Sequence, residues 1–366
     1  MRKIKIFLLL TLLFLVHPFT NAQSNDLRVI AYYSGSADKL DDFQVEKLTH
    51  IIYCFGHLSG NELYIGKEGG AILSKMVQLK KRNKDLKVLM SLGGWGGCKT
   101  CSDVFAGQEA RRQFASSVKS LLALYEADGI DLDWEYPGIE GFIGHNYDSS
   151  DKQHFTSLIR TLRDTLGNAY EISFAAGGFQ SYMDSAVEWK EVMPLVNYVN
   201  LMSYDLVNGY ATITGHHTPL YSTPEQVLSV DWGVRALTDR GVPKEKIVIG
   251  AAFYGRVWGN VADSNNGLYG QGKFIESHSI RKIDDLLDGK EYTYYWDDKA
   301  KAPYMYSNSK QLFITYDDKR SIGLKTQYAI DQQLGGIMFW QLGLDYTTGG
   351  LLNEIDKTKK SGKATK

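Results

Sequence analysis

Eight short runs of apolar and β-branched residues, separated by amphipathic stretches, constrain the fold of this chain more than any other feature. The runs cover residues 28–33, 50–55, 86–92, 129–134, 171–176, 198–204, 247–253 and 336–341. Strands that alternate with helices build parallel sheets, and eight such units predict a closed (β/α)8 barrel. The chain has 366 residues and 43% hydrophobic content, which is enough for one large core.

Helical patterns lie between several of these runs. Apolar residues recur every three or four positions over 114–125 and 155–166, and Gly167 follows the second stretch as a stop signal. A third helix is predicted to open near residue 224, with Thr223 as its cap, Gln226 closing a capping box and Gly241 beyond its end.

One long segment interrupts the alternation of strands and helices. It lies between the run ending near Phe253 and a helix expected near Asp317, and it is rich in Gly, Asn and aromatic residues. A structureless loop of this length is rare in a compact domain, so we expect a small α+β insertion over residues 257–316, between the seventh strand and the seventh helix. The barrel would then comprise residues 23–256 and 317–357, followed by a disordered basic tail over 358–366.

The N-terminus has the three zones of a secretory signal peptide. Arg2, Lys3 and Lys5 precede an apolar run over 6–16, and small residues lead to a cleavage site expected after Ala22. We therefore expect a secreted or periplasmic protein without an integral membrane segment in the mature chain; an uncleaved anchor is the alternative. Removing residues 1–22 moves the formal charge from −1 to −4, which gives no bias toward nucleic acid or anionic membranes.

The three cysteines are too few for a disulfide scaffold. Cys54 lies inside an apolar run and is expected to be a small buried side chain. Cys98 and Cys101 would suit a redox motif, half of a zinc site or a local disulfide. No second cysteine pair completes a zinc site, so we predict the disulfide.

Residues 128–138, DGIDLDWEYPG, place an unusual set of acids in a predicted strand. Side chains alternate along a strand, so Asp131, Asp133 and Glu135 share one face, with Cα atoms about 6.6 Å apart. Acids this close cannot all stay charged when they are shielded from water, so at least one should hold a proton near neutral pH. Ligation of Ca²⁺ or Mg²⁺ is the weaker alternative, because Leu132 and Trp134 favour extended backbone.

The position of these acids predicts a role for Glu135. It lies at the carboxyl-terminal end of the fourth strand, where barrels build their active sites. Negative charge nearby and burial both raise the pKa of a carboxyl group, so Glu135 suits protonation of a leaving oxygen.

The spacing of Asp128, Asp131, Asp133 and Glu135 resembles the signature of glycoside hydrolase family 18, the chitinases and their relatives. Other segments match that family in order: residues 91–95 (SLGGW), 202–205 (MSYD), 253–256 (FYGR) and 335–340 (GGIMFW). The resemblance covers nearly the whole mature chain and implies a barrel with an inserted subdomain.

The resemblance also implies a retaining mechanism in which the substrate supplies the nucleophile. Glu135 would protonate the glycosidic oxygen, Asp133 would orient the 2-acetamido group, Asp131 would share a proton with Asp133, and Tyr204 would donate a hydrogen bond to the acetamido oxygen. The expected partners are chitin or chito-oligosaccharides. We expect a monomer without cofactor or metal.

Several further residues are predicted to bind the sugar chain by similarity. Trp340 would lie under the cleaved sugar and Trp95 under the adjoining leaving group, because pyranose C–H faces pack on aromatic rings. The remaining candidates are Asp205, Met202, Arg256, Tyr254, Tyr32, Phe55, Gly94, Ala176, Tyr136, Tyr210 and Gln341. For Tyr32, Tyr210 and Tyr254, packing in the core or at the barrel mouth is an equal alternative.

Three other functions compete with a chitinase. An endo-β-N-acetylglucosaminidase acting on N-glycans would use the same acids. A catalytically silent lectin would use the same barrel, but such proteins typically lack the acid that Glu135 supplies here. A phosphate-binding metabolic barrel would need a glycine-rich phosphate loop after its last two strands, and the sequence shows none.

Overall fold

The structure is a computed structural model that describes residues 27–364. The expected signal peptide, residues 1–22, lies outside the described residues. Among those that are described, no helix combines the length and the hydropathy needed to cross a membrane.

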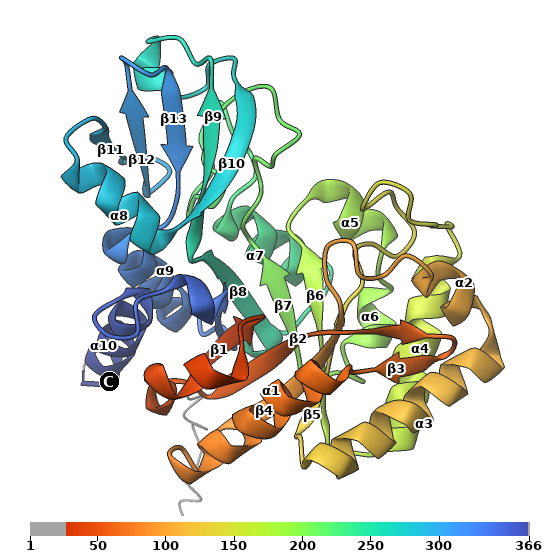
Figure 1. The fold of residues 1–366 in the computed structure, drawn as a ribbon. Helices are drawn as coiled ribbons and strands as arrows, with labels where there is room; N and C mark the ends of the chain where they lie inside the picture. Colours follow the sequence, from red (N-terminus) through yellow and green to blue (C-terminus); the bar gives the residue numbers. More distant parts are fainter. Residues whose placement is uncertain (1–26, 365–366) are drawn as a thin grey trace, which may run out of the picture.

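Eight parallel strands close into a barrel, which confirms the predicted fold class (Figure 1). Around the barrel they are β1 (Arg28–Tyr33), β14 (Gly336–Trp340), β8 (Ile247–Ala252), β7 (Tyr198–Met202), β6 (Glu171–Gly177), β5 (Gly129–Asp133), β4 (Lys87–Gly93) and β2 (His50–Ser59), and β2 pairs with β1 to close the sheet. Each lies where a strand was predicted. The main difference is β2, which runs past Phe55 to pair with the short antiparallel β3 (Glu62–Tyr64).

Helices surround the barrel. They are α1 (Lys67–Gln78), α2 (Cys101–Ala106), α3 (Gln108–Tyr125), α4 (Asp151–Leu166), α5 (Gln180–Ser185), α6 (Trp189–Val192), α7 (Val230–Asp239), α9 (Lys319–Asp331) and α10 (Leu351–Ala364). Short 3₁₀ helices are η1 (Ala37–Asp42), η2 (Val45–Lys47), η3 (Leu79–Lys81), η4 (Lys244–Lys246), η5 (Asn265–Gly267) and η6 (Leu342–Leu344). The predictions for 114–125 and 155–166 are confirmed by α3 and α4, and Gly167 ends α4 with a positive φ of 64°.

The helix predicted to begin near residue 224 does not begin there. Gln226 does donate its backbone N–H to the Thr223 hydroxyl, at 3.1 Å, as a capping turn would. Its side-chain amide, however, pairs with the backbone of His216, at 2.7 and 2.9 Å, instead of returning to the cap. The helix α7 therefore begins six residues later, at Val230, with Ser229 as its cap.

Two apolar layers follow from the alternation of side chains along the strands. Outward residues such as Ile130 and Leu132 pack with the helices in one large cluster. Inward residues, including Ile30, Leu89 and Val248, fill the barrel in a smaller cluster. A residue's place in this alternation therefore decides whether it can take part in a site inside the barrel.

A second sheet follows β8, within the segment where an insertion was expected. It contains β9 (Tyr254–Gly259), β10 (Lys273–Ser279), β11 (Thr293–Asp297), β12 (Ala302–Ser307) and β13 (Leu312–Thr315), in the antiparallel order β10-β9-β13-β12-β11, together with α8 (Ile280–Asp288). Figure 1 shows this sheet at the upper end of the barrel. Its first strand begins at Tyr254, three residues before the expected boundary.

A fully buried ion pair fastens the end of this insertion to the barrel. The Nζ atom of Lys325, on α9, lies 2.7 Å from each carboxylate oxygen of Asp317 and 2.6 Å from the Thr218 hydroxyl. Asp317 also accepts hydrogen bonds from the backbone N–H of Ala252, at the end of β8, and from the hydroxyl of Ser321. The pair thus joins the segment after β13, the loop after β7 and the end of β8.

The basic tail expected to be disordered from residue 358 is instead the last part of α10, which is helical as far as residue 364. Three apolar side chains near the start of this helix are buried: Leu351, Leu352 and Ile355. The ammonium group of Lys360 lies 2.7 Å from the carboxylate of Asp356, one turn earlier. Apolar anchoring and ion pairs spaced by four residues favour the helix over a free chain. Residues 365–366 lie outside the described part.

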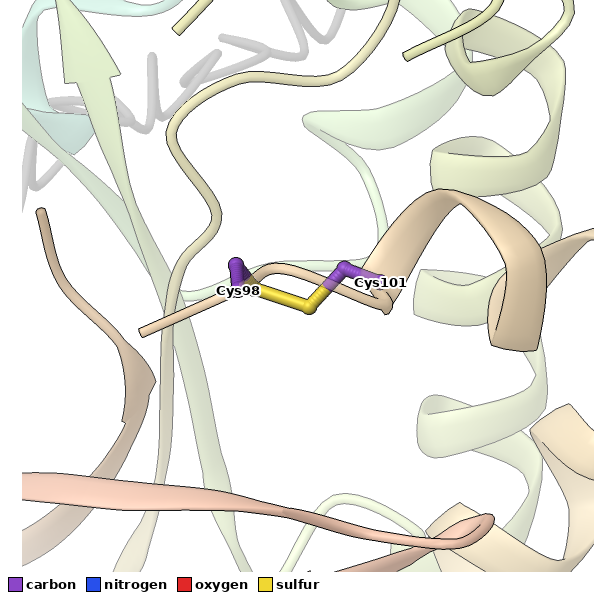
Figure 2. The surroundings of a disulfide bond; sticks show 2 residues. All are labelled: Cys98 and Cys101. Atoms are coloured by element: carbon purple, nitrogen blue, oxygen red, sulfur yellow. A yellow bond between two sulfur atoms is a disulfide. The ribbon is translucent and has the colours of Figure 1, made fainter. Parts of the chain in front are cut away.

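The predicted disulfide between Cys98 and Cys101 is present. Figure 2 shows that it joins the loop before α2 to the first turn of that helix. Both cysteines are buried, and Cys98 follows Trp95 by three residues in the same loop. Cys54 is buried inside the barrel, as expected.

Candidate active site

The three acids of the predicted column lie at the carboxyl-terminal end of β5. Asp131 and Asp133 belong to the strand, Glu135 follows it, and all three side chains are buried. Ile130, Leu132 and Trp134 point the other way, into the outer core. The alternation predicted from the sequence therefore holds across the whole motif.

Asp131 is fixed by hydrogen bonds from four other strands of the barrel. Its carboxylate accepts from the hydroxyls of Ser173 (2.6 Å), Ser91 (3.0 Å) and Tyr32 (3.1 Å) and from the amide of Asn200 (3.1 Å). Burial raises the pKa of Asp131, and these donors oppose the rise because they stabilise the ionised form.

Ser91, Ser173 and Asn200 are site residues that the sequence analysis missed. Each is a polar residue at an inward position of an otherwise apolar strand, and each is fully buried. Buried polar groups need hydrogen-bond partners, so polar residues at inward positions of apolar strands indicate a polar site inside the barrel.

Asp133 lies between the other two acids in the sequence, and the negative charge of Glu135 disfavours its ionisation. Its Oδ1 atom is buried and has no hydrogen-bond partner among the described residues. Burial raises its pKa well above the usual range, and the charges of Glu135 and then Asp131 raise it further. The hydrogen bonds described for Asp131 come from Ser, Tyr and Asn side chains, and proton sharing between Asp131 and Asp133 stays a prediction. Glu135 is the stronger partner.

Glu135 has the pKa of a general acid that works near neutrality. Burial raises the pKa to about 7; hydrogen bonding with Tyr136 opposes the rise, and the charge of Asp205 adds to it. A group with this pKa can give up a proton and take one back at neutral pH.

Asp205 follows β7 and is held by Arg256 of β9. The guanidinium binds the carboxylate through two nitrogens, with Nε at 2.7 Å from Oδ1. Burial alone would raise the pKa of Asp205, but contact with His217, whose Nδ1 lies 3.5 Å from Oδ1, and the hydrogen bonds and positive charge of Arg256 lower it well below the usual range. Asp205 therefore remains a fixed negative charge, which acts on Glu135, and Arg256 connects the insertion to the site.

Inward-facing aromatic and thioether side chains surround the acids. The hydroxyl of Tyr204 lies 3.9 Å from the sulfur of Met338, and its ring meets Tyr254 edge to face. Burial raises the pKa of Tyr204 well above its usual value, so the phenol keeps its proton and can donate it in a hydrogen bond. Met202 and Tyr32 belong to the same inner cluster.

An aromatic lining runs from β14 toward β5. Trp340 stacks on Phe55, with ring centroids 5.6 Å apart, and lies 6.1 Å from Tyr32. Gly94 packs so closely on Phe55 that a Cβ atom there would stand 2.4 Å from the ring. The next residue, Trp95, is 48% exposed and contacts Tyr136. The structure thus brings together the predicted residues of β2, β4, β5 and β14.

For three predicted binding residues, no side-chain contact with the acids is described within residues 27–364. Ala176 is in the outer core, because Ser173 faces inward and the alternation then points Ala175 into the barrel. Gln341 donates to the Ser34 hydroxyl at 2.9 Å and accepts from a backbone N–H, so it ties two loops together. Tyr210 is highly exposed on the loop after β7, and no contact with another aromatic ring is described for it among residues 27–364.

These features define a class of protein. A (β/α)8 barrel has two neighbouring buried acids at the carboxyl-terminal end of β5, and burial raises the pKa of one of them, Glu135, to about 7. An exposed tryptophan lies beside them, which suits a sugar ring. Together they are the parts of a glycoside hydrolase.

Comparison with known proteins places the chain within that class. Residues 28–345 match the family Glycosyl hydrolases family 18, and the chain belongs to this family. It is 29% identical to Chitinase A1 of Niallia circulans over 95% of this chain and 62% of that protein, and 28% identical to Chitinase B of Serratia marcescens over 86% and 76%. A solved structure of a family 18 N-acetylglucosaminidase from Paenibacillus barengoltzii has 37% identity and a TM-score of 0.83, covering 91% of this chain and 99% of that one. The chain thus spans less than two thirds of Chitinase A1.

Proposed function

We propose that this protein is a secreted chitinase, which hydrolyses β-1,4 bonds between N-acetylglucosamine units. The single observation that carries the proposal is the burial of Asp133 and Glu135 next to each other at the carboxyl-terminal end of β5, where burial raises the pKa of Glu135 to about 7. Membership of family 18 and the chitinases among its relatives support the same substrate class.

The first step of the proposed mechanism breaks the glycosidic bond. Glu135 gives its proton to the glycosidic oxygen, while the carbonyl oxygen of the substrate's 2-acetamido group attacks the anomeric carbon. The bond between that carbon and the leaving oxygen breaks, and a cyclic oxazolinium ion forms. Asp133 accepts the acetamido N–H through Oδ1, which has no protein partner, and offsets the positive charge. Tyr204 donates a hydrogen bond to the acetamido oxygen.

The second step restores the enzyme. Glu135, now ionised, takes a proton from a water molecule whose oxygen attacks the anomeric carbon and opens the ring of the oxazolinium ion. The sugar leaves with its original configuration and Glu135 is protonated again. Because the nucleophile belongs to the substrate, cleavage requires an N-acetylated sugar at the bond that breaks.

A second candidate is the release of single N-acetylglucosamine residues from chain ends. The observation that favours it is the 37% identity with the N-acetylglucosaminidase of Paenibacillus barengoltzii, which this chain covers almost completely. The chemistry of the acids would be the same, and the two candidates differ in the products that leave the enzyme.

Product analysis on N-acetylchitohexaose tests the proposal and separates the two candidates. We expect residues 23–366 to cleave the acetylated hexamer and to leave a fully deacetylated hexamer intact. Internal cleavage to dimers, trimers and tetramers supports a chitinase, and stepwise release of the monomer supports the second candidate. Equal cleavage of both hexamers would contradict the substrate-assisted mechanism, and binding without cleavage would favour a lectin.

The pH dependence of activity tests the coupling of Asp133 and Glu135. Glu135 acts as an acid only while protonated, so kcat should fall as pH rises through about 7. Asp133→Asn removes a buried carboxyl group whose pKa depends on the charge of Glu135, so the pH at which activity falls should change, and kcat should drop about 100-fold. Rate profiles of both proteins between pH 4 and 9, a range chosen to bracket the expected fall at about 7, provide the measurement. A variant profile with an unchanged alkaline limb would show that the two acids titrate independently.

A further inference from the structure

The aromatic lining continues beyond Trp95 onto the loop that follows Glu135. The ring of Phe142 meets the indole of Trp95 edge to face, with centroids 5.6 Å apart and planes at 76°. Phe142 is 38% exposed and Trp95 is 48% exposed, so both rings present apolar surface to solvent. Two exposed aromatic rings in contact at the side of an active site are unusual unless they bind something.

Local packing holds Phe142 in this position. Gly96 has a positive φ of 88°, and a Cβ atom there would already be in van der Waals contact with the Phe142 ring, at 3.5 Å. The backbone N–H of His145 donates to the carbonyl of Phe142 at 3.0 Å, which closes a turn, and the His145 ring lies 5.2 Å from that of Phe142. The ring of Phe142 thus rests on the Trp95 loop on one side and on its own turn on the other.

Buried Asp151 clamps the two loops together. Its carboxylate accepts from the hydroxyl of Ser102 on α2 at 2.8 Å, and from the backbone N–H groups of Asp148 (2.9 Å) and Gly138 (3.4 Å). Gly138 and Asp148 flank the Phe142 turn, whereas Ser102 follows Cys101, whose disulfide with Cys98 lies at the end of the Trp95 loop (Figure 2).

A second tie crosses the same boundary. The side-chain amide of Asn146 donates to a carboxylate oxygen of Asp103 on α2, at 2.8 Å. With the hydrogen bonds of Asp151, it joins the segment that follows the Trp95 loop to the Phe142 loop, and the disulfide ties the end of the Trp95 loop to the first turn of α2. A surface that is already ordered loses little conformational freedom when a ligand binds.

From this arrangement we propose that Phe142 is a sugar-binding residue, which contacts a further N-acetylglucosamine unit of the substrate chain beyond the unit on Trp95. The inference rests on the proposed function and extends its substrate class to longer chito-oligosaccharides. The contacts form one series of neighbouring residues. Trp340 stacks on Phe55, and Gly94, which precedes Trp95, packs against Phe55. Trp95 then contacts Phe142. A linear chain of pyranose rings can lie along such a series, because each sugar has an apolar C–H face.

Steady-state kinetics on two substrates test the role of Phe142. For Phe142→Ala we expect KM for N-acetylchitohexaose to rise about five- to tenfold, with kcat within about twofold of the wild type. An aryl glycoside of N-acetylchitobiose places only its aryl group on the Trp95 side, so its kcat and KM should not change. Phe142→Tyr, which keeps an aromatic face, should restore KM for the hexamer.

Ile143→Ala is the matched control, because Ile143 is the next residue of the same loop, is 74% exposed, and makes no part of the aromatic series. Equal KM values for the Phe142→Ala and Ile143→Ala variants on the hexamer would overturn the proposal. So would a parallel loss on the aryl glycoside, because that result would mean that Phe142 only supports the loop next to Glu135. If the wild type cleaves neither substrate, the proposed function fails. The role of Phe142 is then tested separately by calorimetric binding of the hexamer to the wild type and to Phe142→Ala. Weaker binding by the variant supports the role of Phe142, and equal affinity overturns it.

Discussion

Glu135→Gln is expected to abolish turnover, lowering kcat on N-acetylchitohexaose by at least about 1,000-fold while the hexamer still binds. General acid–base catalysis contributes about 10² to 10⁴ in rate, and here one group serves both steps. The amide has nearly the same shape as the carboxyl group but can neither give the proton to the leaving oxygen nor take one from water. Product release measures kcat, and calorimetry on the variant measures the dissociation constant.

The exposed carboxyl group of Glu140 provides a matched control for this substitution. Glu140 lies on the same loop, five residues after Glu135, and faces solvent. Glu140→Gln should keep kcat within about twofold, because an exposed charge is screened by water and salt. Activity of Glu135→Gln within tenfold of the wild type would show that another group supplies the proton and would overturn the proposed mechanism.

Lys325→Met is expected to destabilise the fold by about 3 to 5 kcal/mol without touching the acids. Methionine fills a similar volume, but the carboxylate of Asp317 would remain fully buried without its cation. Burial lowers the pKa of Lys325, and the charge of Asp317 raises it, so the lysine depends on Asp317 for its charged state. The free energy of unfolding, measured by urea denaturation, gives the effect.

Two further variants separate loss of the ion pair from loss of a lysine. Lys319→Met removes an exposed lysine from the first turn of the same helix and should change the free energy of unfolding by less than about 0.5 kcal/mol. The double variant Lys325→Met with Asp317→Asn removes both charges, keeps an acceptor for the backbone N–H of Ala252, and should recover much of the lost stability. If Lys325→Met alone costs less than about 1 kcal/mol, the buried pair is not what joins the insertion to the barrel.

The barrel and the column of acids could be predicted because both depend on local periodicity. Eight apolar runs define the strands, and alternation along β5 puts Asp131, Asp133 and Glu135 on one face. The prediction for Ala176 was wrong for the same physical reason, because an error of one position along β6 moves a side chain from the inner to the outer face.

Interactions between distant segments could not be predicted in this way. The hydrogen bonds to Asp131 come from residues up to 99 positions away in the sequence. The side chain of Gln226 binds the backbone of His216 instead of capping a helix, and this contact depends on the tertiary fold. The contact of Phe142 with Trp95 likewise joins two loops, and the sequence between them carries no periodic signal for it.

The four donors around Asp131 have a consequence for how the protein acquires activity during synthesis. Tyr32, Ser91, Ser173 and Asn200 lie on β1, β4, β6 and β7, so the carboxylate is fully satisfied only when strands from opposite walls of the barrel have come together. A nascent chain in which β5 has left the ribosome and β7 has not carries the complete acid motif. It still lacks the hydrogen-bond donor on β7 that helps to orient Asp131. Activity is therefore expected only after the barrel has closed, and the time at which activity appears would mark that closure.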